Sequence, residues 1–511
     1  MRSSSRREFL KYLSWAGAAL SLPWPASATT SDHPGRAVEV TGRVRGPNGG
    51  LEGVPVTDGI NVTQTGADGR YQLASSTRQP FVYLSVPAGY RLPTHDTGTA
   101  HFYRPLDPGE GDAVEATFRL QPLDRADEKH AFLFLADPQT QTEAEVQEFQ
   151  DGTVPDVRQT VKALGDRPVF GVGGGDLVFD DLSLFPGYEA AVQQMGIPVV
   201  QVVGNHDLNF DAPGDPGSTA TFRQYFGPEY YSFDRGAVHY VVLDDVYWPG
   251  SDGFGRKTDD YFGHLDPAQL AWLKQDLALV EDGRPVVVLL HIPPLSTAYE
   301  RRGESSPSVR GMISNRDALY ELLSPFDAHI ISGHVHENEH RYAASPHEHV
   351  VGTTCGAWWT GPICYDGTPR GYAVYEVNGE SLQWRYKATG HDADHQLRLY
   401  PAGADPTSPD EFVANVWGAD DEWTVVWYED GVRTGHMARR VGVDPMSDRL
   451  YDGDDRPEKH TWVDPQPTAH LYYAPFNPDA SRIRVEATDR FGRTYTSALN
   501  AEADPAGTTS G

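Results

Sequence analysis

Five short, mostly apolar stretches constrain the fold of this chain more than any other feature, because a polar motif directly follows each of them. The stretches occupy residues 132–135, 169–172, 199–203, 286–290 and 329–332. Short β-branched runs of this kind predict strands that are buried on both faces of a sheet. Open α/β sheets bind ligands beyond the carboxyl ends of their strands, so the five motifs are expected to meet at one edge.

The five motifs carry carboxylates, an amide and histidines. In chain order they are Asp137-Pro138-Gln139, Gly175-Asp176, Gly204-Asn205-His206-Asp207, His291 and Gly333-His334-Val335-His336. Oxygen and imidazole donors of these types are common ligands of divalent metal ions. The sequence therefore predicts a metal site at that edge of the sheet.

Together the motifs resemble those of the calcineurin-like metallophosphoesterases in order, spacing and strand context, over residues 130–400. Gly-Asn-His-Asp after a buried strand, with Gly-His-X-His downstream, carries most of the resemblance. The resemblance implies an α/β core that forms a four-layer αββα sandwich of two mixed sheets. It also implies a hydrolase that acts on phosphoric mono- or diesters, either a phosphatase or a phosphodiesterase.

The resemblance further implies two divalent metal ions, of Mn, Fe, Zn, Mg or Ca, and a bridging hydroxide that attacks phosphorus in line. Asp176 matches the bridging ligand, a role that needs a carboxylate because two oxygens must reach two ions. The other ligands implied are Asp137 and His336 for the first metal, and Asn205, His291 and His334 for the second. His206 matches the general acid, and Asp207 is expected to orient it and to raise its pKa.

One position departs from the family pattern. The first motif of the family is usually Asp-X-His, but Gln139 occupies the histidine position. An amide oxygen is a poorer donor than imidazole for transition metals, so we expect the first metal to be held weakly, through Gln139 or through water. Acidic residues also come slightly later than usual in the second motif, and Asp180 is expected to be a supporting acid rather than a ligand.

Several other polar and aromatic residues have more than one interpretation. Trp358 and Trp359, followed by Arg370, either form the wall of a substrate pocket or pack at the sheet edge. Three arginines after His291 are better explained as solvated side chains than as phosphate contacts: Arg301, Arg302 and Arg310. The remaining histidines considered are expected to be ordinary core or surface residues: His239, His264, His329, His340, His347, His349, His391 and His395.

At 511 residues the chain is too long for a single core. Residues 36–122 alternate in the manner of a small β-sandwich and resemble carboxypeptidase-regulatory-like or transthyretin-like domains. Residues 130–400 form the predicted catalytic core, residues 410–500 a second β-sandwich of immunoglobulin or fibronectin type, and residues 501–511 a disordered tail.

The first 28 residues match a twin-arginine signal peptide, with Ser5-Arg6-Arg7-Glu8-Phe9-Leu10-Lys11 as its motif and Ala26-Ser27-Ala28 as its cleavage site. The apolar segment of about eleven residues is shorter than the roughly 20 that a membrane span needs. We therefore expect export to the periplasm or the extracellular space, with no transmembrane segment in the mature chain. Cys355 and Cys364 either form a disulfide there or remain free.

The formal net charge of −30 suits an acidic secreted protein or one adapted to high salt. It argues against nucleic-acid binding, because there is no basic patch to meet phosphates. A small-molecule or cell-surface phosphoester is the expected substrate, and the oligomeric state is open. Two alternatives to the enzyme are a weakly active or non-catalytic binding protein on a partly degenerate site, and an adhesion role for the sandwich domains.

Overall fold

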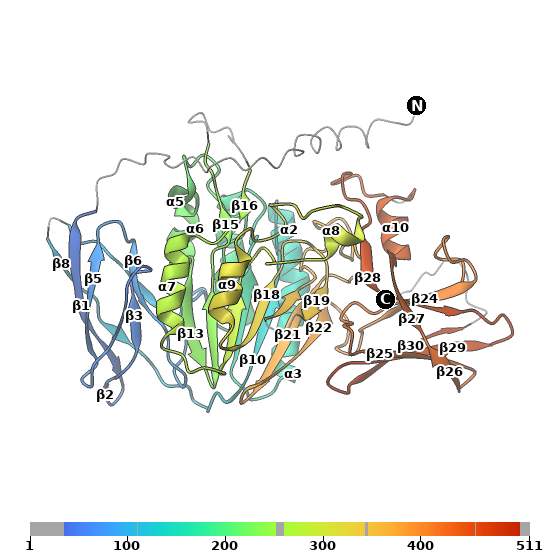
Figure 1. Ribbon diagram of the computed structural model, residues 1–511, viewed down its shortest axis with the longest axis horizontal. Helices are drawn as coiled ribbons and strands as arrows, with labels where there is room; N and C mark the ends of the chain where they lie inside the picture. Colours follow the sequence, from blue (N-terminus) through green and yellow to red (C-terminus); the bar gives the residue numbers. More distant parts are fainter. Residues whose placement is uncertain (1–34, 110, 252–259, 343–345, 455, 501–511) are drawn as a thin grey trace. The chain divides into compact units, whose positions relative to one another are not determined.

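The computed structural model describes residues 35–109, 111–251, 260–342, 346–454 and 456–500. The expected signal peptide and the expected tail lie outside these residues. The described chain has an α/β core, with one β-rich domain before it and another after it in the sequence (Figure 1). Within this part of the chain, no helix is both long and apolar enough to cross a membrane.

The first core sheet is mixed and has the strand order β12-β11-β10-β21-β22. β10, β11 and β12 run parallel, and β21 and β22 extend the sheet from β10 as antiparallel strands. The strands span Lys129–Leu135 (β10), Val169–Gly174 (β11), Val199–Val202 (β12), Gly371–Asn378 (β21) and Ser381–Ala388 (β22). β10, β11 and β12 confirm three of the five predicted strands.

The second core sheet is also mixed, with the order β13-β14-β17-β18-β20-β19. Its four central strands are parallel, and β13 and β19 are antiparallel edge strands. The strands span Tyr231–Arg235 (β13), Val238–Val242 (β14), Pro285–Leu289 (β17), Asp327–Ser332 (β18), Glu339–Tyr342 (β19) and His347–Val350 (β20). β17 and β18 confirm the other two predicted strands.

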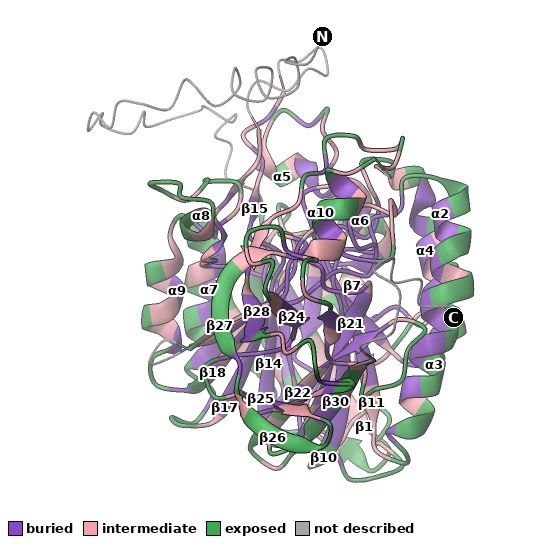
Figure 2. Ribbon diagram, turned by 90° about the vertical axis from the view of Figure 1, so that its right-hand side faces the viewer, coloured by how far each residue is buried: buried purple, intermediate pink, exposed green. Residues whose placement is uncertain are grey.

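Side chains alternate along the core strands and so separate the apolar layers. In β10, Phe132 and Phe134 belong to the layer between the two sheets, whereas Leu133 and Leu135 face helices. Helices α2, α3 and α4 cover the first sheet, and α7 and α9 cover the second. The outer faces of these helices are exposed and the strands between them are buried (Figure 2). The core is thus the predicted αββα sandwich.

The helices of the core are short. Those that cover the sheets are α2 (Glu143–Glu148), α3 (Val154–Ala163), α4 (Phe185–Met195), α7 (Pro267–Leu277) and α9 (Arg316–Leu323). A π-helical turn, Phe149–Thr153, joins α2 to α3, and a 3₁₀ turn, Leu182–Leu184, precedes α4. The remaining core elements are α5 (Asp215–Ser218), α6 (Ala220–Phe226), α8 (Ala298–Arg301), β15 (Val246–Tyr247) and β16 (Phe262–Gly263).

The N-terminal domain has two small sheets. In one, β1 (Ala37–Gly46) pairs with β2 (Gly49–Gly50), β5 (Arg70–Ser76), β8 (Ala113–Glu115) and β9 (Phe118–Arg119). The other has the order β4 (Val62–Gln64), β3 (Pro55–Thr57), β6 (Phe81–Leu84) and β7 (Tyr103–Pro105). Apolar residues alternate toward the inside, as in β1, where Val38 and Val40 are buried.

The C-terminal domain has two four-stranded antiparallel sheets. One has the order β23 (Arg398–Tyr400), β24 (Glu411–Asn415), β28 (Pro467–Pro475) and β27 (Ala438–Val443). The other has the order β26 (Val432–His436), β25 (Thr424–Glu429), β29 (Arg482–Thr488) and β30 (Thr494–Asn500). Helix α10 (Pro445–Tyr451) lies between β27 and β28 in the sequence. β23, placed by sequence at the end of the core, pairs with β24 instead.

Phe132 provides a test of the packing between the two core sheets. Its ring stacks on Tyr375 with 4.5 Å between ring centroids, and the ring of Phe170 lies 5.3 Å away. We expect Phe132→Ala to lower the free energy of unfolding by about 3–5 kcal/mol, because it leaves a cavity. Phe132→Leu keeps most of the volume and should cost less than about 1.5 kcal/mol. Urea unfolding followed by tryptophan fluorescence measures both, and equal losses would contradict this packing.

Candidate functional site

The polar motifs of both core sheets meet at the carboxyl ends of their strands. The first sheet contributes Asp137, Asp176 and Asn205, and the second contributes His291, His334 and His336. All are buried except His334, which is partly exposed. One ligand atom from each of Asp176, His291 and His334 lies within 4.8 Å of the other two. The structure therefore brings together residues that are 199 positions apart, from Asp137 to His336.

Left-handed backbone turns the side chains into this common space. Five of the candidate residues have φ between 43° and 70°: Asp137, Gln139, Asp176, His334 and His336. This conformation is uncommon for residues other than glycine, and it costs about 1–3 kcal/mol for each residue that adopts it. Two glycines leave the space that the turned side chains need. A Cβ at Gly175 would lie 2.4 Å from the His291 ring, and one at Gly333 would lie 2.4 Å from the Asp137 carboxylate.

The carboxylate of Asp176 lies at the centre of the cluster. Its Oδ1 accepts a hydrogen bond from the backbone N–H of His206 at 2.8 Å and lies 3.3 Å from His291 Nε2. The same His291 Nε2 lies 3.2 Å from Asn205 Oδ1 and 3.2 Å from His334 Nδ1. Asp176 thus adjoins the amide and the two imidazoles that form one side of the site.

Asp137 and a histidine form the other side of the site. His336 Nε2 lies 3.6 Å from Asp137 Oδ1, and Asp137 Oδ2 accepts a hydrogen bond from the backbone N–H of His334 at 3.0 Å. Asp137 Oδ1 is buried and has no hydrogen-bond partner among the described residues. A buried carboxylate oxygen of this kind is costly unless a cation or a donor meets it.

Each of the three histidines is oriented by a backbone carbonyl. His291 Nδ1 lies 3.0 Å from the oxygen of Gly174, and His336 Nδ1 lies 2.6 Å from that of Gly356. His334 reverses the pattern, with Nε2 2.9 Å from the oxygen of Arg310. In each ring the nitrogen that bonds the carbonyl is the donor, and the other nitrogen points into the site. Metal-binding histidines are commonly held in this way.

The electrostatics of the cluster suit bound cations. Burial raises the pKa of Asp137 to about 7; His291 lowers it, and the Asp176 carboxylate raises it further. Burial lowers the pKa of His334 to about 3 and that of His336 to about 4, so both rings are neutral and keep a lone pair. His291 differs: burial lowers its pKa, but Asp176 outweighs that effect and raises it to about 10. The unpartnered oxygen, the carboxylates and the oriented imidazoles fit divalent metal ions.

Comparison with known proteins identifies the family of the chain. The family model for calcineurin-like phosphoesterase matches residues 130–338, and models for the N-terminal and C-terminal regions of calcineurin-like phosphoesterases match residues 38–123 and 348–495. The chain belongs to the calcineurin-like phosphoesterases. It carries both the core of this family and the N-terminal and C-terminal regions that accompany that core.

Individual relatives of this calcineurin-like phosphoesterase are distant. Purple acid phosphatase 23 of Arabidopsis thaliana is 27% identical over 158 residues, which cover 28% of this chain and 29% of that protein. The purple acid phosphatase PPD1 of yellow lupin (Lupinus luteus) is 14% identical, with a TM-score of 0.35 over 64% of this chain and 56% of that one. Phosphopantetheinyl hydrolase of Mycobacterium tuberculosis is 11% identical, with a TM-score of 0.30, and the match covers 45% of this chain and 91% of that one.

His206 stands beside the cluster, but its partner is not the expected one. His206 Nδ1 bonds to Asp180 Oδ1 at 2.6 Å. Asp207 instead accepts three backbone N–H groups, at 2.9, 3.1 and 3.2 Å, from the loops after β11 and β12. The expectation that Asp207 orients His206 is therefore wrong: adjacent side chains point apart, and Asp207 is buried beneath the loops. Burial lowers the pKa of His206, but Asp176 and Asp180 outweigh this effect and raise it.

Gln139 lies inside the site of this family member. Its Nε2 donates to Asp176 Oδ2 at 3.0 Å, and its Oε1 lies 3.7 Å from Cys355 Sγ. In this orientation the amide is a donor to the central carboxylate, and a ligand role requires the amide to rotate so that its oxygen faces the site. Both Cys355 and Cys364 are buried free thiols, so the disulfide alternative is not the one that the structure shows.

The two tryptophans after β20 have different positions. Trp358 stacks on His336 with 4.2 Å between ring centroids and so faces the site. Trp359 Nε1 donates to the carbonyl of Pro138 at 2.9 Å, and the Arg370 guanidinium lies 5.1 Å from the Trp359 ring. Trp359 therefore contacts the first motif through the carbonyl of Pro138, and Arg370 packs against Trp359.

Aromatic residues from two domains continue from Trp358 across the site. We call Phe179, Trp358, His460 and Trp462 the aromatic rim. The centroid distances along it are 4.2 Å (His206–Phe179), 6.1 Å (Phe179–His460), 5.2 Å (His460–Trp462) and 4.5 Å (Trp462–Trp358). His460 and Trp462 come from the C-terminal domain, and Trp462 is 54% exposed. Sequence reasoning missed both, because only tertiary packing brings this loop to the core.

The guanidinium groups of the three arginines after His291 all pair with acidic residues, and that of Arg310 pairs with Asp260 at 2.7 Å. Arg301 is buried, pairs with Glu337 and Glu339, and donates to the carbonyl of Pro467. The expectation of a solvated side chain therefore fails for Arg301, although the residue is also not turned toward a phosphate. Arg302 pairs with Glu304, as a surface residue would.

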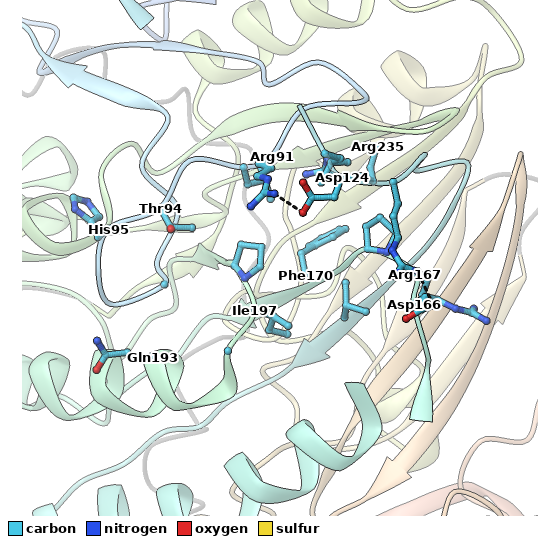
Figure 3. Close-up of a pocket in the computed structure, with 18 of the residues that line it drawn as sticks. Arg91, Thr94, His95, Asp124, Asp166, Arg167, Phe170, Gln193, Ile197 and Arg235 are labelled. Carbon is cyan, nitrogen blue, oxygen red and sulfur yellow. Dashed lines mark hydrogen bonds and ion pairs between the residues drawn. The ribbon is translucent and has the colours of Figure 1, made fainter. Parts of the chain in front are cut away.

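A separate cavity of about 500 Å³ lies at the amino ends of β11 and β12 (Figure 3). It is lined by residues of the N-terminal domain and of the core, and its arginines include Arg91 and Arg125, which pair with Asp124 and Asp166. This edge of the sheet is opposite to the one that carries the metal-site residues. The cavity is therefore not part of the phosphoesterase site.

The Gln139 position yields a direct test. We expect Gln139→His to raise metal occupancy and affinity, because imidazole is the better donor for transition metals. Gln139→Leu, which removes both amide atoms, is the matched control and should not raise either quantity. Metal per chain by inductively coupled plasma mass spectrometry, with a chelator competition, gives both values. Unchanged occupancy and affinity in Gln139→His would contradict the weak-site interpretation.

Mutation of the two acidic residues near His206 should have different effects: one should lower activity and the other should lower stability. Asp180→Ala removes the partner of His206 Nδ1, so kcat should fall about 10–100-fold, while the melting temperature hardly changes because the side chain is 45% exposed. Asp207→Ala leaves three buried N–H groups unpaired and should lower the free energy of unfolding by at least about 3 kcal/mol. Steady-state kinetics and thermal unfolding of both variants measure these effects. A loss of stability in Asp180→Ala with a loss of activity alone in Asp207→Ala would refute the roles assigned to the two residues.

Proposed function

We propose that this phosphoesterase uses two metal ions and that His206 protonates the leaving oxygen of the ester. The observation that supports the proposal is the Asp176 carboxylate, whose Oδ1 lies 3.3 Å from His291 Nε2 and whose Oδ2 accepts a hydrogen bond from Gln139 of the first motif at 3.0 Å. Asp137 and His336 would hold one ion, and Asn205, His291 and His334 the other. Asp176 would contact both ions. When bound, such ions lower the pKa of a water molecule and neutralise charge on the phosphoryl oxygens.

His206 is held in the orientation that a proton donor needs. The bond to Asp180 fixes Nδ1, and Nε2 faces the Asp176 carboxylate at 4.0 Å. The stacked ring of Phe179 covers one face of the imidazole and limits its rotation. A leaving oxygen between the metal-site residues and His206 would receive the Nε2 proton, a step that typically contributes about 10²–10⁴-fold to the rate.

The aromatic rim supports an organic ester that carries a ring. Trp358 and Trp462 present large apolar surfaces next to His336, and aromatic side chains stack favourably on planar groups. Trp462 is largely exposed, so it is available for contact with a substrate. The name of the Arabidopsis relative adds support for phosphatase activity. Both monoesters and diesters fit this reasoning, because neither the donor set nor the rim excludes a second ester group.

We further propose that the enzyme acts outside the cytoplasm, in the periplasm or the extracellular space. The twin-arginine motif at residues 5–11 supports export. The acidic composition suits a secreted protein. A fusion of residues 1–35 to a reporter that works only after export would test this proposal.

A chelate-and-restore assay tests the catalytic proposal. Metal-stripped protein should be inactive, and activity should return when Mn, Fe, Zn, Mg or Ca is added singly, on either an aryl phosphate monoester or the bis-aryl diester. His206→Ala should lose about 10²–10⁴-fold in kcat while its metal content stays unchanged. Full activity in chelator, or in that variant, would refute the mechanism. No turnover by fully metallated protein would favour the alternative of a binding protein on a degenerate site.

A further inference from the structure

A second group of histidines lies at the other end of the second core sheet. His329 is on β18, His340 on β19, and His347 and His349 on β20. The register places His329 opposite His347, and His340 opposite His349. Side chains at paired positions of neighbouring strands lie close together on the same face. The sheet register therefore gathers four imidazoles that are spread over 21 residues of sequence.

Three of these histidines converge closely enough to share an ion. One ring nitrogen from each of His329, His347 and His349 lies within 4.8 Å of the other two. His329 Nδ1 and His349 Nε2 are 3.0 Å apart, and the rings of His347 and His349 are 4.0 Å apart between centroids. These separations are comparable with those between the ligands of a metal ion bound at about 2.0–2.1 Å by imidazole.

The group also has nitrogen atoms that no described residue satisfies. His347 Nε2, His349 Nδ1 and His340 Nδ1 are all buried atoms without a hydrogen-bond partner among the described residues. His349 itself is completely buried. Unsatisfied polar atoms are costly, and three within one cluster need an explanation. Edge-to-face contacts of His347 and His349 with Trp384 account for the packing of these rings but not for the unpartnered atoms.

The charge around the cluster permits a cation. Arg490 is the nearby positive charge, but it pairs with Asp420 at 2.9 Å and with Glu422 at 3.3 Å. These three residues together carry one net negative charge. Burial lowers the pKa of all four histidines, to about 4 for His329 and His340, so the rings are neutral and have lone pairs for a metal.

We propose that His329, His347 and His349 bind a transition-metal ion of the Zn²⁺ class, with His340 beside them as a further donor. A set of imidazoles alone suits Zn²⁺, Cu²⁺ and Ni²⁺ better than Mg²⁺ or Ca²⁺, which prefer oxygen. His329 and His347 are partly exposed and provide the entry path. The ion replaces the contact between His329 and His349, and the proton of the donor ring moves to its other nitrogen, so no net proton is released.

This site is distinct from the phosphoesterase centre. His329 lies near the start of β18, whereas His334 follows the carboxyl end of that strand, five residues further along the chain. The ion would connect β18 to β20, next to the edge strand β19, and would lie against Trp384 of the first core sheet. We infer a structural role, in which the metal holds the edge of the second sheet.

Metal counting on the full chain tests the proposal. Metal-stripped protein is titrated with Co²⁺ or Zn²⁺, and the bound equivalents are measured by mass spectrometry and, for Co²⁺, by visible absorption. We expect the variant with His347→Gln and His349→Gln to bind one equivalent less than the wild type and to keep its phosphoesterase activity. The matched control carries His391→Gln and His395→Gln, a stacked pair with 4.3 Å between centroids, and should lose none.

The outcomes separate this site from the phosphoesterase centre. Asp176→Asn should lower metal content and activity together but leave the equivalent that depends on His347 and His349. If the double variant does not fold, His329→Gln alone should weaken that equivalent at least tenfold, since it removes a partly exposed ligand. Zn²⁺ should also raise the melting temperature of the wild type more than that of either His variant. Equal stoichiometry and affinity in all these proteins would overturn the proposal.

Discussion

Two carboxylates, Asp137 and Asp176, are buried in one site, and the rest of the active-site structure depends on that fact. Burial disfavours charge on both. Burial and the Asp176 carboxylate raise the pKa of Asp137, whereas neighbouring histidines outweigh burial and lower the pKa of Asp176. The structure offsets this cost with the backbone N–H groups of His206 and His334 and with the imidazoles of His291 and His206. Asp137 Oδ1 still has no hydrogen-bond partner among the described residues, and a divalent cation would satisfy it. The placement of these two residues thus favours a bound cation in this site.

The fold makes this placement possible because the parallel strands of both mixed sheets end at the same edge. Each strand stops just before a ligand residue, and after β10, β11 and β18 a left-handed backbone turns the ligand side chain toward the site. Gly175 and Gly333 leave room for the turned side chains. The C-terminal domain then adds His460 and Trp462 to the aromatic rim. The site is therefore built from the core, but one wall of it comes from another domain.

The buried strands and their polar motifs could be predicted from sequence because both signals are local. Apolar runs identified the strands, and the strand ends identified Asp137, Asp176, Asn205, His291, His334 and His336 as residues that meet. Side-chain direction could not be predicted. Asp207 is adjacent to His206 in the sequence but points into the loops, whereas Asp180 reaches His206 from the loop after β11. Likewise Arg301 is neutralised by Glu337 and Glu339, which only the tertiary fold brings near. The histidine group around His349 depends on strand register, which the sequence pattern did not define.

The central claim is that Asp176 lies between two metal ions. Crystals grown with Mn²⁺ and measured at the manganese absorption edge test it most directly, through an anomalous difference map. The account predicts two peaks that share the Asp176 carboxylate, one near Asp137 and His336, the other near Asn205, His291 and His334. A map without a peak at bonding distance from Asp176, or with a single peak that Asp176 does not touch, would contradict it.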